Sequence, residues 1–269
     1  MTVLKVAIVS NQTPKSAAAN ERLHILLKEA GHTIDQKDPD IVISIGGDGT
    51  LLSAFHLYNH KLDHIRFLGV HTGHLGFYTD WRDYELEELV ESLCRDEKQR
   101  ISYPLLDVSI RYHHEKEDRH FLALNESTIK RGNSTMVADI YIKDDLFERF
   151  RGDGVSLSTP TGSTAYNKSV GGAVLHPSIN ALQLSEIASL NNRVYRTLGS
   201  PLIVPEKEWV TIKLPETTDY AITVDQISIR EEQIDSICYQ IAKERIQFAS
   251  YRHTHFWDRV RDAFIGELE

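Results

Sequence analysis

Short apolar runs alternate with longer stretches of helical periodicity over the first hundred residues. The runs are rich in β-branched residues and cover 4–10, 40–46 and 65–71, and the helical stretches cover 19–32, 50–60 and 84–98. Strands that alternate with helices in this way are typical of βα units around a parallel sheet. The pattern predicts an α/β domain over residues 1–100 with a Rossmann- or flavodoxin-like sheet, whose first helix ends at Gly31.

The pattern changes after about residue 100. Strand-length segments follow one another at 104–113, 120–131, 136–143, 146–159, 209–215, 220–229 and 234–242. They predict a β-rich domain over 101–250 with antiparallel strands and one helical insertion around 163–192. The tail over 251–269 returns to helical spacing, and its apolar face is predicted to comprise Phe256, Trp257, Val260, Phe264 and Ile265. This C-terminal helical segment is expected to pack back on the first domain.

Composition and charge narrow the class of protein. The 30 lysines and arginines among the 269 residues stand against 39 acidic residues, and the resulting net charge of −9 opposes binding to nucleic acid or to an anionic membrane. The two cysteines, Cys94 and Cys238, lack metal-binding spacing, and their small number suits a reducing compartment. No apolar run is as long as a membrane span, and the N-terminus does not read as a signal peptide. A cytoplasmic protein without a nucleic-acid or membrane partner is expected.

The stretch IVISIGGDGTLLSAF, residues 41–55, sets a buried strand directly against a glycine-rich loop and a helix. Such a junction leaves backbone N–H groups at a helix N-terminus, where phosphate binds, and glycines let the ligand approach the main chain. The candidate phosphate-binding residues are Gly46, Gly47, Asp48, Gly49 and Thr50. A carboxylate among phosphates is repelled unless it holds a metal, a sugar hydroxyl or a proton in transfer. Alternatively, Asp48 or Thr50 caps the helix.

A second candidate motif lies in RGDGVSLSTPTGSTAYNKSVGGAVLHP, residues 151–177. Small residues, hydroxyls and exposed main chain surround one aromatic residue, Tyr166, which suits a nucleotide better than a core. Ordinary helix capping and a packed tyrosine are the alternative for each residue taken singly. His71 and His74 have a spacing compatible with a metal, but local hydrogen bonds in a glycine-rich segment are the preferred interpretation, so no metal ligand is assigned.

Several long motifs in one order resemble the NAD kinases of the compact bacterial type. They are GGDGT at 46–50, HTGHLGFYTDW at 71–81, NE at 125–126, RFRGDG at 149–154, TPTGSTAYNKSVGGA at 159–173 and EIASLNNRVYRTLGSP at 186–201. The resemblance implies transfer of the ATP γ-phosphoryl group to the 2′-hydroxyl of the adenosine ribose of NAD, giving NADP. It further implies a homotetramer. Mg²⁺ or another divalent cation with ATP is expected because an acidic protein offers little positive charge of its own to hold a triphosphate.

The resemblance also implies roles for individual residues. Asp48 matches the proton acceptor, with Gly49 beside it, and Asn125 and Glu126 match a pair that binds the adenine and ribose of NAD. Further positions match the dinucleotide site: His71, Phe77, Arg151, Asp153, Thr164, Ala165, Tyr166, Ser169 and Ala188. Gln226 departs from the family, whose bacterial members often carry histidine there, and glutamine cannot become cationic.

The GGDGT loop taken alone leaves two other functions open. A lipid or sugar kinase shares this kind of loop, but it requires an acyl channel or a basic clamp for a sugar phosphate, and neither pattern is evident. A non-catalytic nucleotide sensor could keep Asp48 to bind a ribose. The motifs after residue 120 favour the NAD kinase.

Overall fold

The computed structural model describes residues 2–73, 76–113, 117–132, 134–216, 220–230, 233–252 and 255–266. The chain forms two compact units, and the first of them is built from both ends of the sequence. Unit 1 comprises Met1–Ser102 and Arg245–Glu269, and unit 2 comprises Tyr103–Glu244. Among the described residues, no helix has both the length and the apolar character that a membrane span requires.

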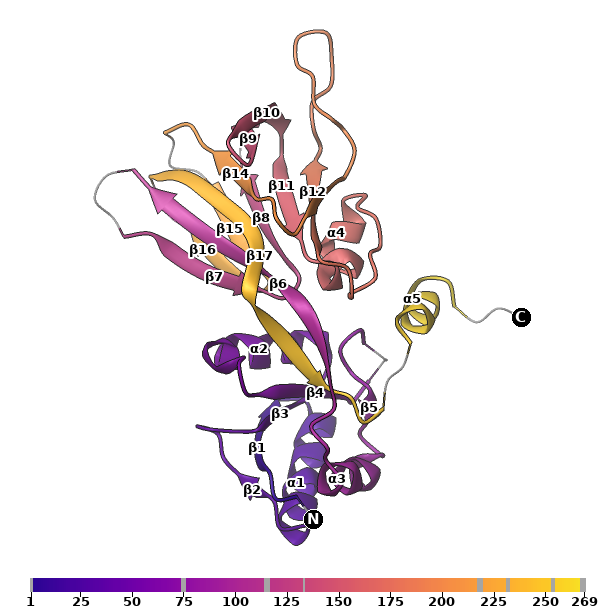
Figure 1. Cartoon of the computed structure of the whole chain (residues 1–269). Helices are drawn as coiled ribbons and strands as arrows, with labels where there is room; N and C mark the ends of the chain where they lie inside the picture. The colour runs from indigo at the N-terminus through magenta and orange to yellow at the C-terminus, as the bar shows by residue number, and fades with distance from the viewer. Residues whose placement is uncertain are drawn as a thin grey trace. The chain divides into compact units, whose positions relative to one another are not determined.

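Unit 1 contains a parallel sheet with the strand order β2-β1-β3-β4 (Figure 1). Its strands are β1 (Lys5–Ser10), β2 (Thr33–Ile34), β3 (Ile41–Ile45), β4 (Arg66–His71) and β5 (Trp81–Arg82), which pairs with β4. Its helices are α1 (Pro14–Glu29), α2 (Asp48–Tyr58), the 3-10 turn η1 (Asn59–Lys61), α3 (Leu86–Cys94) and α5 (Phe256–Phe264). The predicted α/β domain with a parallel sheet is therefore confirmed.

Helices cover both faces of this sheet. Leu23 of α1 and Leu89 of α3 pack with Ile43 in one apolar cluster. On the opposite face, the ring of Phe55 from α2 lies 6.4 Å from that of Phe67 in β4. Figure 1 accordingly shows α2 on one side of the strands and α1 and α3 on the other. Burial on both faces explains why all five residues of β3 are buried and why every one of them except Ser44 is apolar.

Local sequence sets the ends of the first helix. Thr13 caps α1 because its side chain accepts a hydrogen bond from the N–H of Ser16, and Pro14 occupies the first helical position. Gly31 follows the helix with a φ of +80°, and its N–H donates to the carbonyl of Lys28. The prediction that Gly31 ends this helix is confirmed, since glycine adopts this left-handed conformation without steric cost.

Unit 2 is built mainly of antiparallel strands. One sheet has the order β13-β12-β11-β8-β15-β16, and a second set of strands runs β10-β9-β14-β17, with β6 pairing with β17 and β7. The bounds are β6 (Arg100–Tyr112), β7 (Arg119–Ala123), β8 (Glu126–Arg131), β9 (Met136–Ile142), β10 (Asp145–Gly152), β11 (Gly154–Ser158), β12 (Ala181–Ile187), β13 (Leu202–Pro205), β14 (Val210–Lys213), β15 (Tyr220–Val224), β16 (Ile227–Arg230) and β17 (Ile234–Ala249). The predicted β-rich second domain is confirmed.

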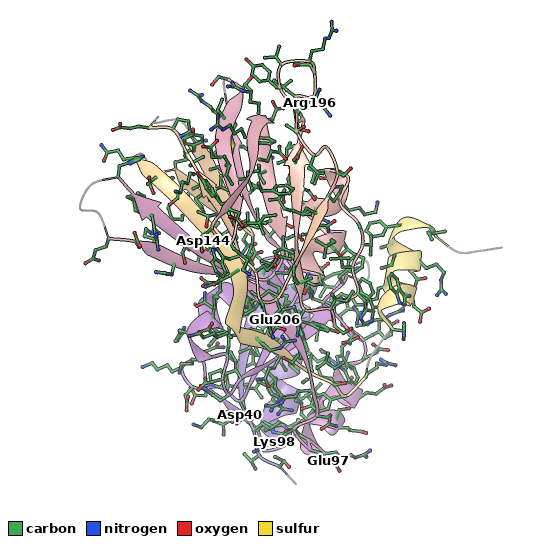
Figure 2. The ribbon with its side chains drawn as sticks, turned by 45° about the horizontal axis from the view of Figure 1, so that its top comes forward. Asp40, Glu97, Lys98, Asp144, Arg196 and Glu206 are labelled. Atoms are coloured by element: carbon green, nitrogen blue, oxygen red, sulfur yellow. The ribbon has the colours of Figure 1, made fainter. Side chains whose placement is uncertain are left out.

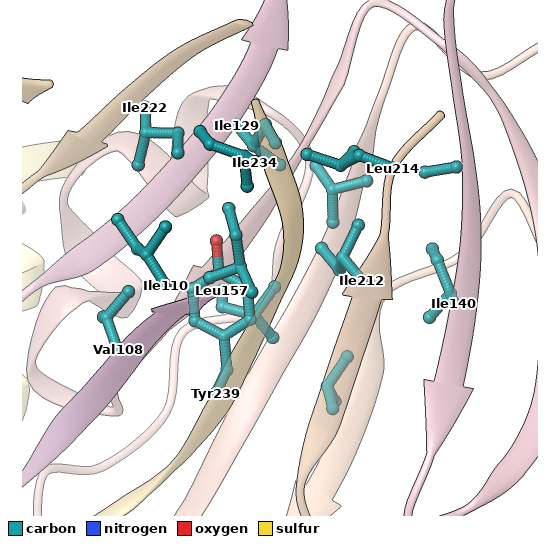
Figure 3. Close-up of a cluster of buried hydrophobic side chains, with 14 of the residues drawn as sticks. Val108, Ile110, Ile129, Ile140, Leu157, Ile212, Leu214, Ile222, Ile234 and Tyr239 are labelled. Carbon is teal, nitrogen blue, oxygen red and sulfur yellow. The ribbon is translucent and has the colours of Figure 1, made fainter. Parts of the chain in front are cut away.

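The core of unit 2 lies where these strands pack together. Figure 3 shows side chains from β6, β8, β11, β14 and β17 gathered in it, among them Val108, Ile129, Leu157, Ile212 and Tyr239. Each of these five side chains is fully buried. Charged residues of both units occupy many of the connecting segments. All six residues labelled in Figure 2 lie in turns or loops: Asp40, Glu97, Lys98, Asp144, Arg196 and Glu206.

The predicted helical insertion around 163–192 is wrong. The chain forms only a 3-10 turn, η2 (Thr161–Thr164), and a four-residue helix, α4 (Tyr166–Ser169), before β12 begins at Ala181. The sequence pattern did not indicate a strand here because β12 contains two buried polar residues, Gln183 and Ser185. Gln183 bonds to the backbone of Ala173 and Ser185 donates to Asn167 Oδ1, so both are satisfied inside the fold.

The predicted C-terminal helix is confirmed, although its apolar face is only partly buried. Phe256 is buried, and its ring and that of Phe264 lie 6.4 and 5.7 Å from the ring of Phe77 in unit 1. Trp257 and Ile265 are exposed, against the prediction of a single buried face. The helix covers nine residues, and the buried residue that the pattern did not suggest is Arg259.

Candidate active site

Asp48 occupies the first turn of α2, directly after the glycines that end β3. The helix is capped by Gly47, and no side chain bonds to its cap, so the alternative in which Asp48 or Thr50 caps the helix is wrong. The Asp48 carboxylate turns instead toward the segment after β4. The N–H of Phe77 donates to Oδ2 at 2.9 Å, and that of Tyr78 donates to Oδ1 at 3.1 Å. Two backbone donors therefore fix the orientation of this carboxylate.

Gly76 makes this arrangement possible. A Cβ atom built on Gly76 would overlap the Asp48 carboxylate, so only glycine allows the close approach. Gly46 has a comparable steric reason, because its φ is +152° and a Cβ would overlap the side chain of Thr50. Gly47 and Gly49 have no such steric reason: both are exposed, and beyond their own neighbours in the chain no atom of the described residues lies within 4 Å of a Cβ built there. Bare backbone at the start of an eleven-residue helix favours an anionic ligand.

A hollow of about 740 Å³ in unit 1 opens beside the segment that follows β4. Its lining includes Lys15 and Arg22 of α1 and Arg82 of β5, together with His71 and Thr72. A hydrogen bond joins α1 to the segment after β4, because the hydroxyls of Ser16 and Thr72 lie 2.9 Å apart. Another joins the glycine loop before α2 to β4, because the N–H of Gly46 donates to the carbonyl of Val70. The sequence does not reveal that these three basic side chains share one hollow, because they are far apart in the chain, from Lys15 to Arg82.

His71 is buried at the end of β4. Its Nδ1 lies 3.0 Å from the carbonyl oxygen of Gly73, and it carries the proton because a carbonyl only accepts. Its Nε2 is buried and has no hydrogen-bond partner within the described ranges. His74, considered above with His71 as a metal pair, lies outside the described residues. Within the described parts of the chain, no three His, Cys, Asp or Glu side chains are grouped for a metal.

Asn125 and Glu126 lie where β8 begins in unit 2, and Asp225 fixes their backbone. Its Oδ2 accepts from the N–H of Leu124 at 2.9 Å, and its Oδ1 accepts from the N–H groups of Asn125 and Glu126 at 2.7 and 3.2 Å. Asp225 itself has a φ of +50°, a left-handed conformation that aspartate tolerates. Gln226 is the exposed residue that follows it between β15 and β16.

Glu126 is 8% exposed, and its Oε2 has no hydrogen-bond partner among the described residues. Burial, reinforced by the nearby Asp225 carboxylate, raises the pKa of Glu126 to about 8, although the backbone N–H of Tyr166 favours the charged form. Glu126 is therefore protonated at neutral pH, and its carboxyl group can donate one hydrogen bond as well as accept.

This protonation makes stability depend on pH. The pKa of Glu126 in the folded state lies above its unfolded value of 4.5, so the folded state holds more protons between pH 4.5 and about 8. The contribution of this group to stability is fully present below pH 4.5 and is lost as the pH rises through 8. Glu126→Gln, which stays neutral, should be stabilised relative to the wild type as the pH rises from 5 to 9. Urea unfolding at both pH values tests this, and parallel pH profiles for the two proteins would contradict it.

The TPTGSTAY segment packs against the Asn125 backbone. Thr159 Oγ1 donates to the carbonyl of Leu124 at 2.6 Å and accepts from the N–H of Gly162 at 3.0 Å. The N–H of Thr159 donates to the carbonyl of Asn125, and a Cβ on Gly162 would overlap that same carbonyl. The two predicted nucleotide-binding segments thus form one hydrogen-bonded unit.

Tyr166 lies at the start of α4 with its ring half-buried. Lys130 Nζ lies 4.3 Å from the ring centroid, and the same group donates to the tyrosine hydroxyl. Ser169 Oγ donates to the carbonyl of Tyr166, and Thr164 Oγ1 donates to that of Thr161. Ala165 joins η2 to α4. The structure therefore places the backbone of Tyr166 beside Glu126, with Thr164, Ala165 and Ser169 in the same short stretch of chain as Tyr166.

The remaining predicted residues of unit 2 lie where β10 passes into β11. Arg151 stacks on the ring of Tyr195 at 4.2 Å, and its carbonyl accepts from Leu190. Asp153 is exposed, and its N–H donates to the carbonyl of Ile187, one residue before Ala188. Ala188 is exposed and has a φ of +47°. Strain of this kind in a non-glycine residue is often found at ligand-binding sites.

Comparison with known proteins identifies the family. A model described as the ATP-NAD kinase N-terminal domain matches residues 5–98, and one described as the ATP-NAD kinase C-terminal domain matches 124–249. An NAD kinase of Enterococcus faecalis is 68% identical over 98% of this chain and its own full length, and one of Levilactobacillus brevis is 59% identical over 98% of both. A yeast NADH kinase solved with NADH has the same fold, with a TM-score of 0.85 and 21% identity over 98% of this chain and 88% of its own. An Archaeoglobus fulgidus NAD kinase solved with ATP gives a TM-score of 0.75 and 20% identity over 97% of this chain and 98% of its own. With its two family domains and these relatives along almost its whole length, the chain belongs to the NAD kinase family.

Proposed function

We propose that this chain phosphorylates the 2′-hydroxyl of the adenosine ribose of NAD, with Asp48 as the proton acceptor. The observation that carries this assignment is the anchoring of Asp48 by the amides of Phe77 and Tyr78. Each carboxylate oxygen uses one lone pair on an amide and keeps another for a ligand hydroxyl. The close relatives along the chain support an NAD kinase over a lipid kinase, a sugar kinase or a sensor.

Phosphoryl transfer requires little covalent chemistry from the protein. The transition state is loose, so catalysis depends on holding the hydroxyl in line with the phosphate and on neutralising charge. A ribose hydroxyl is a weak nucleophile, and a fixed carboxylate within hydrogen-bond reach orients it and takes its proton as the P–O bond forms. Asp48 suits this task because its own position is set by two backbone donors.

The phosphates of ATP are assigned to unit 1. The backbone of Gly47 and Gly49 is exposed at the start of α2, and Lys15, Arg22 and Arg82 line the hollow in the same unit. Mg²⁺ would reach the site on the triphosphate, held mainly by phosphate oxygens and water, and would supply charge neutralisation. Gly46 and Thr50 shape the loop rather than offer donors to the ligand, since each is buried.

The dinucleotide is assigned mainly to groups of unit 2, and His71 and Phe77 of unit 1 are matched to it as well. Asn125 and protonated Glu126 offer a donor and an acceptor each for adenine and ribose, and the half-buried face of Tyr166 suits a ring. Asp153 is exposed and suits the nicotinamide carboxamide as an acceptor. We assign the other matched positions to the same ligand: His71, Phe77, Arg151, Thr164, Ala165, Ser169, Ala188 and Gln226. A homotetramer is proposed from the family resemblance, and light scattering of the purified protein tests it.

A coupled assay tests the activity directly. Purified protein with Mg-ATP and NAD should produce NADP, detected by an NADP-specific dehydrogenase, and chelation of Mg²⁺ should stop the reaction. Diacylglycerol, sphingosine and fructose 6-phosphate serve as alternative acceptors in parallel reactions with labelled ATP. Turnover of one of these acceptors with no NADP formed at saturating NAD would overturn the proposal. Binding of NAD without any turnover would favour the sensor.

A further inference from the structure

Arg259 is a buried arginine in the C-terminal helix α5, with 6% of its surface exposed. Its Nη1 donates to the carbonyl oxygens of Gly76 at 2.8 Å and Thr79 at 2.9 Å, and its Nη2 pairs with the carboxylate of Asp80. All three partners belong to the segment that follows β4. Because the guanidinium is planar and carries its donors in a fixed fork, these bonds fix the segment at three points.

The same helix also contacts this segment through aromatic rings. The rings of Phe256 and Phe264 lie 6.4 and 5.7 Å from the ring of Phe77. Aromatic pairs at these distances are attractive beyond the area they bury. Helix α5 therefore holds residues 76–80 both by backbone hydrogen bonds and by packing on Phe77.

The held segment is the one that orients Asp48. The carbonyl of Gly76 and the N–H of Phe77 belong to a single planar peptide unit. Arg259 donates to the carbonyl oxygen of that peptide unit, and the N–H of the same unit, which belongs to Phe77, donates to Asp48 Oδ2. A shift of the Arg259 guanidinium would tilt this peptide plane and move the donor away from the carboxylate. Gly76 has no Cβ and allows the peptide to lie this close to Asp48.

We propose that Arg259 is a positioning residue for phosphoryl transfer, acting on Asp48 through the Gly76–Phe77 peptide unit. The proposal rests on the proposed role of Asp48 as proton acceptor. Without the guanidinium, we expect the protein to fold and to bind NAD, with a carboxylate that samples orientations that do not meet the ribose hydroxyl. Small displacements of a catalytic group from its productive geometry reduce the rate by large factors.

Two substitutions of Arg259 and one matched control test the proposal. Arg259→Met keeps the aliphatic stem and removes all donors, and it should lower kcat on the order of 10- to 100-fold with KM for NAD changed less than about two-fold. Arg259→Lys keeps the positive charge but lacks the planar set of donors of the guanidinium, and it should give an intermediate kcat. Arg261→Met is the control and should leave kcat unchanged, since the ion pairs of Arg261 within the described residues are with Asp258 and Asp262 of its own stretch.

A double-mutant cycle separates positioning from general destabilisation. If Arg259 acts through Asp48, adding Arg259→Met to the Asp48→Asn variant should lower its residual activity by less than about two-fold. An equal loss in both backgrounds, or a loss that appears in KM alone, would overturn the proposal. Hydrogen exchange provides a readout independent of activity: the amides of Phe77 and Tyr78 should exchange faster in Arg259→Met and Arg259→Lys, with β3 unchanged. Unchanged exchange would also overturn it, whereas absence of NADP formation by the wild type would refute only the proposed function.

Discussion

Asp48→Asn is expected to lower kcat on the order of 100-fold or more while NAD still binds with nearly wild-type affinity. The amide side chain cannot accept the ribose proton. It also has one acceptor oxygen in place of two, whereas the carboxylate now accepts from both Phe77 and Tyr78. One of these N–H groups would face the asparagine NH₂ group, so the segment after β4 is expected to loosen as well.

Steady-state kinetics with the NADP-specific readout gives kcat, and calorimetry gives the affinity for NAD. Hydrogen exchange at Phe77 and Tyr78 reports how far the loss of anchoring accompanies the loss of chemistry. A variant that binds NAD poorly but turns over normally at saturation would assign Asp48 to binding of the ground state. Normal kcat and normal affinity together would remove Asp48 from the mechanism.

Gly162→Ala is expected to destabilise the protein by about 3 kcal/mol, at the upper end of the usual range for overpacking. The new Cβ would overlap the carbonyl of Asn125, and backbone cannot move aside as the end of a flexible side chain can. For a protein of this size the loss corresponds to a fall in Tm of roughly 6–12 °C. Because Asn125 and Glu126 would shift with the strained carbonyl, weaker binding of NAD is expected too.

Gly132→Ala is the matched control in the same unit. Gly132 is exposed, and beyond its neighbours in the chain no atom of the described residues lies within 4 Å of a Cβ built there. The stability of the protein should therefore change by less than about 0.5 kcal/mol. Calorimetric scans of the two variants and the wild type provide the comparison. Equal Tm values for Gly162→Ala and Gly132→Ala would show that the Asn125 loop adapts to the added methyl group.

The parts of the fold that depend on local pattern could be predicted from the sequence. The strand, glycine loop and helix around Asp48 are consecutive in the chain, and so are the signals that end α1 at Gly31. The prediction failed at β12, where buried Gln183 bonds to Ala173 in the loop before the strand and buried Ser185 bonds to Asn167 in α4. Polar residues that are satisfied internally do not differ in sequence from polar residues in water.

The arrangement of the candidate site could not be predicted in the same way. The side chains of the candidate site bond to backbone groups that are 29 to 183 residues away in the chain. Asp48 and Asp225 accept from backbone N–H groups, and Arg259 donates to backbone C=O groups. Every residue except proline offers the same backbone donor and acceptor, so such partners leave no mark in the sequence. Family resemblance supplied candidate residues, and it did not supply the bonds that orient them. A turn residue such as Asp225 between two alternating strands was the one available signal.

The discontinuity of unit 1 has a consequence for the order of events during synthesis. Residues up to Ser102 leave the ribosome well before Arg245 and the segments after it, by an interval on the order of ten seconds at typical elongation rates. The early part can form its parallel strands, but the peptide that orients Asp48 lacks its guanidinium until α5 emerges. A nascent chain would therefore gain the proposed positioning of Asp48 only after α5 has left the ribosome.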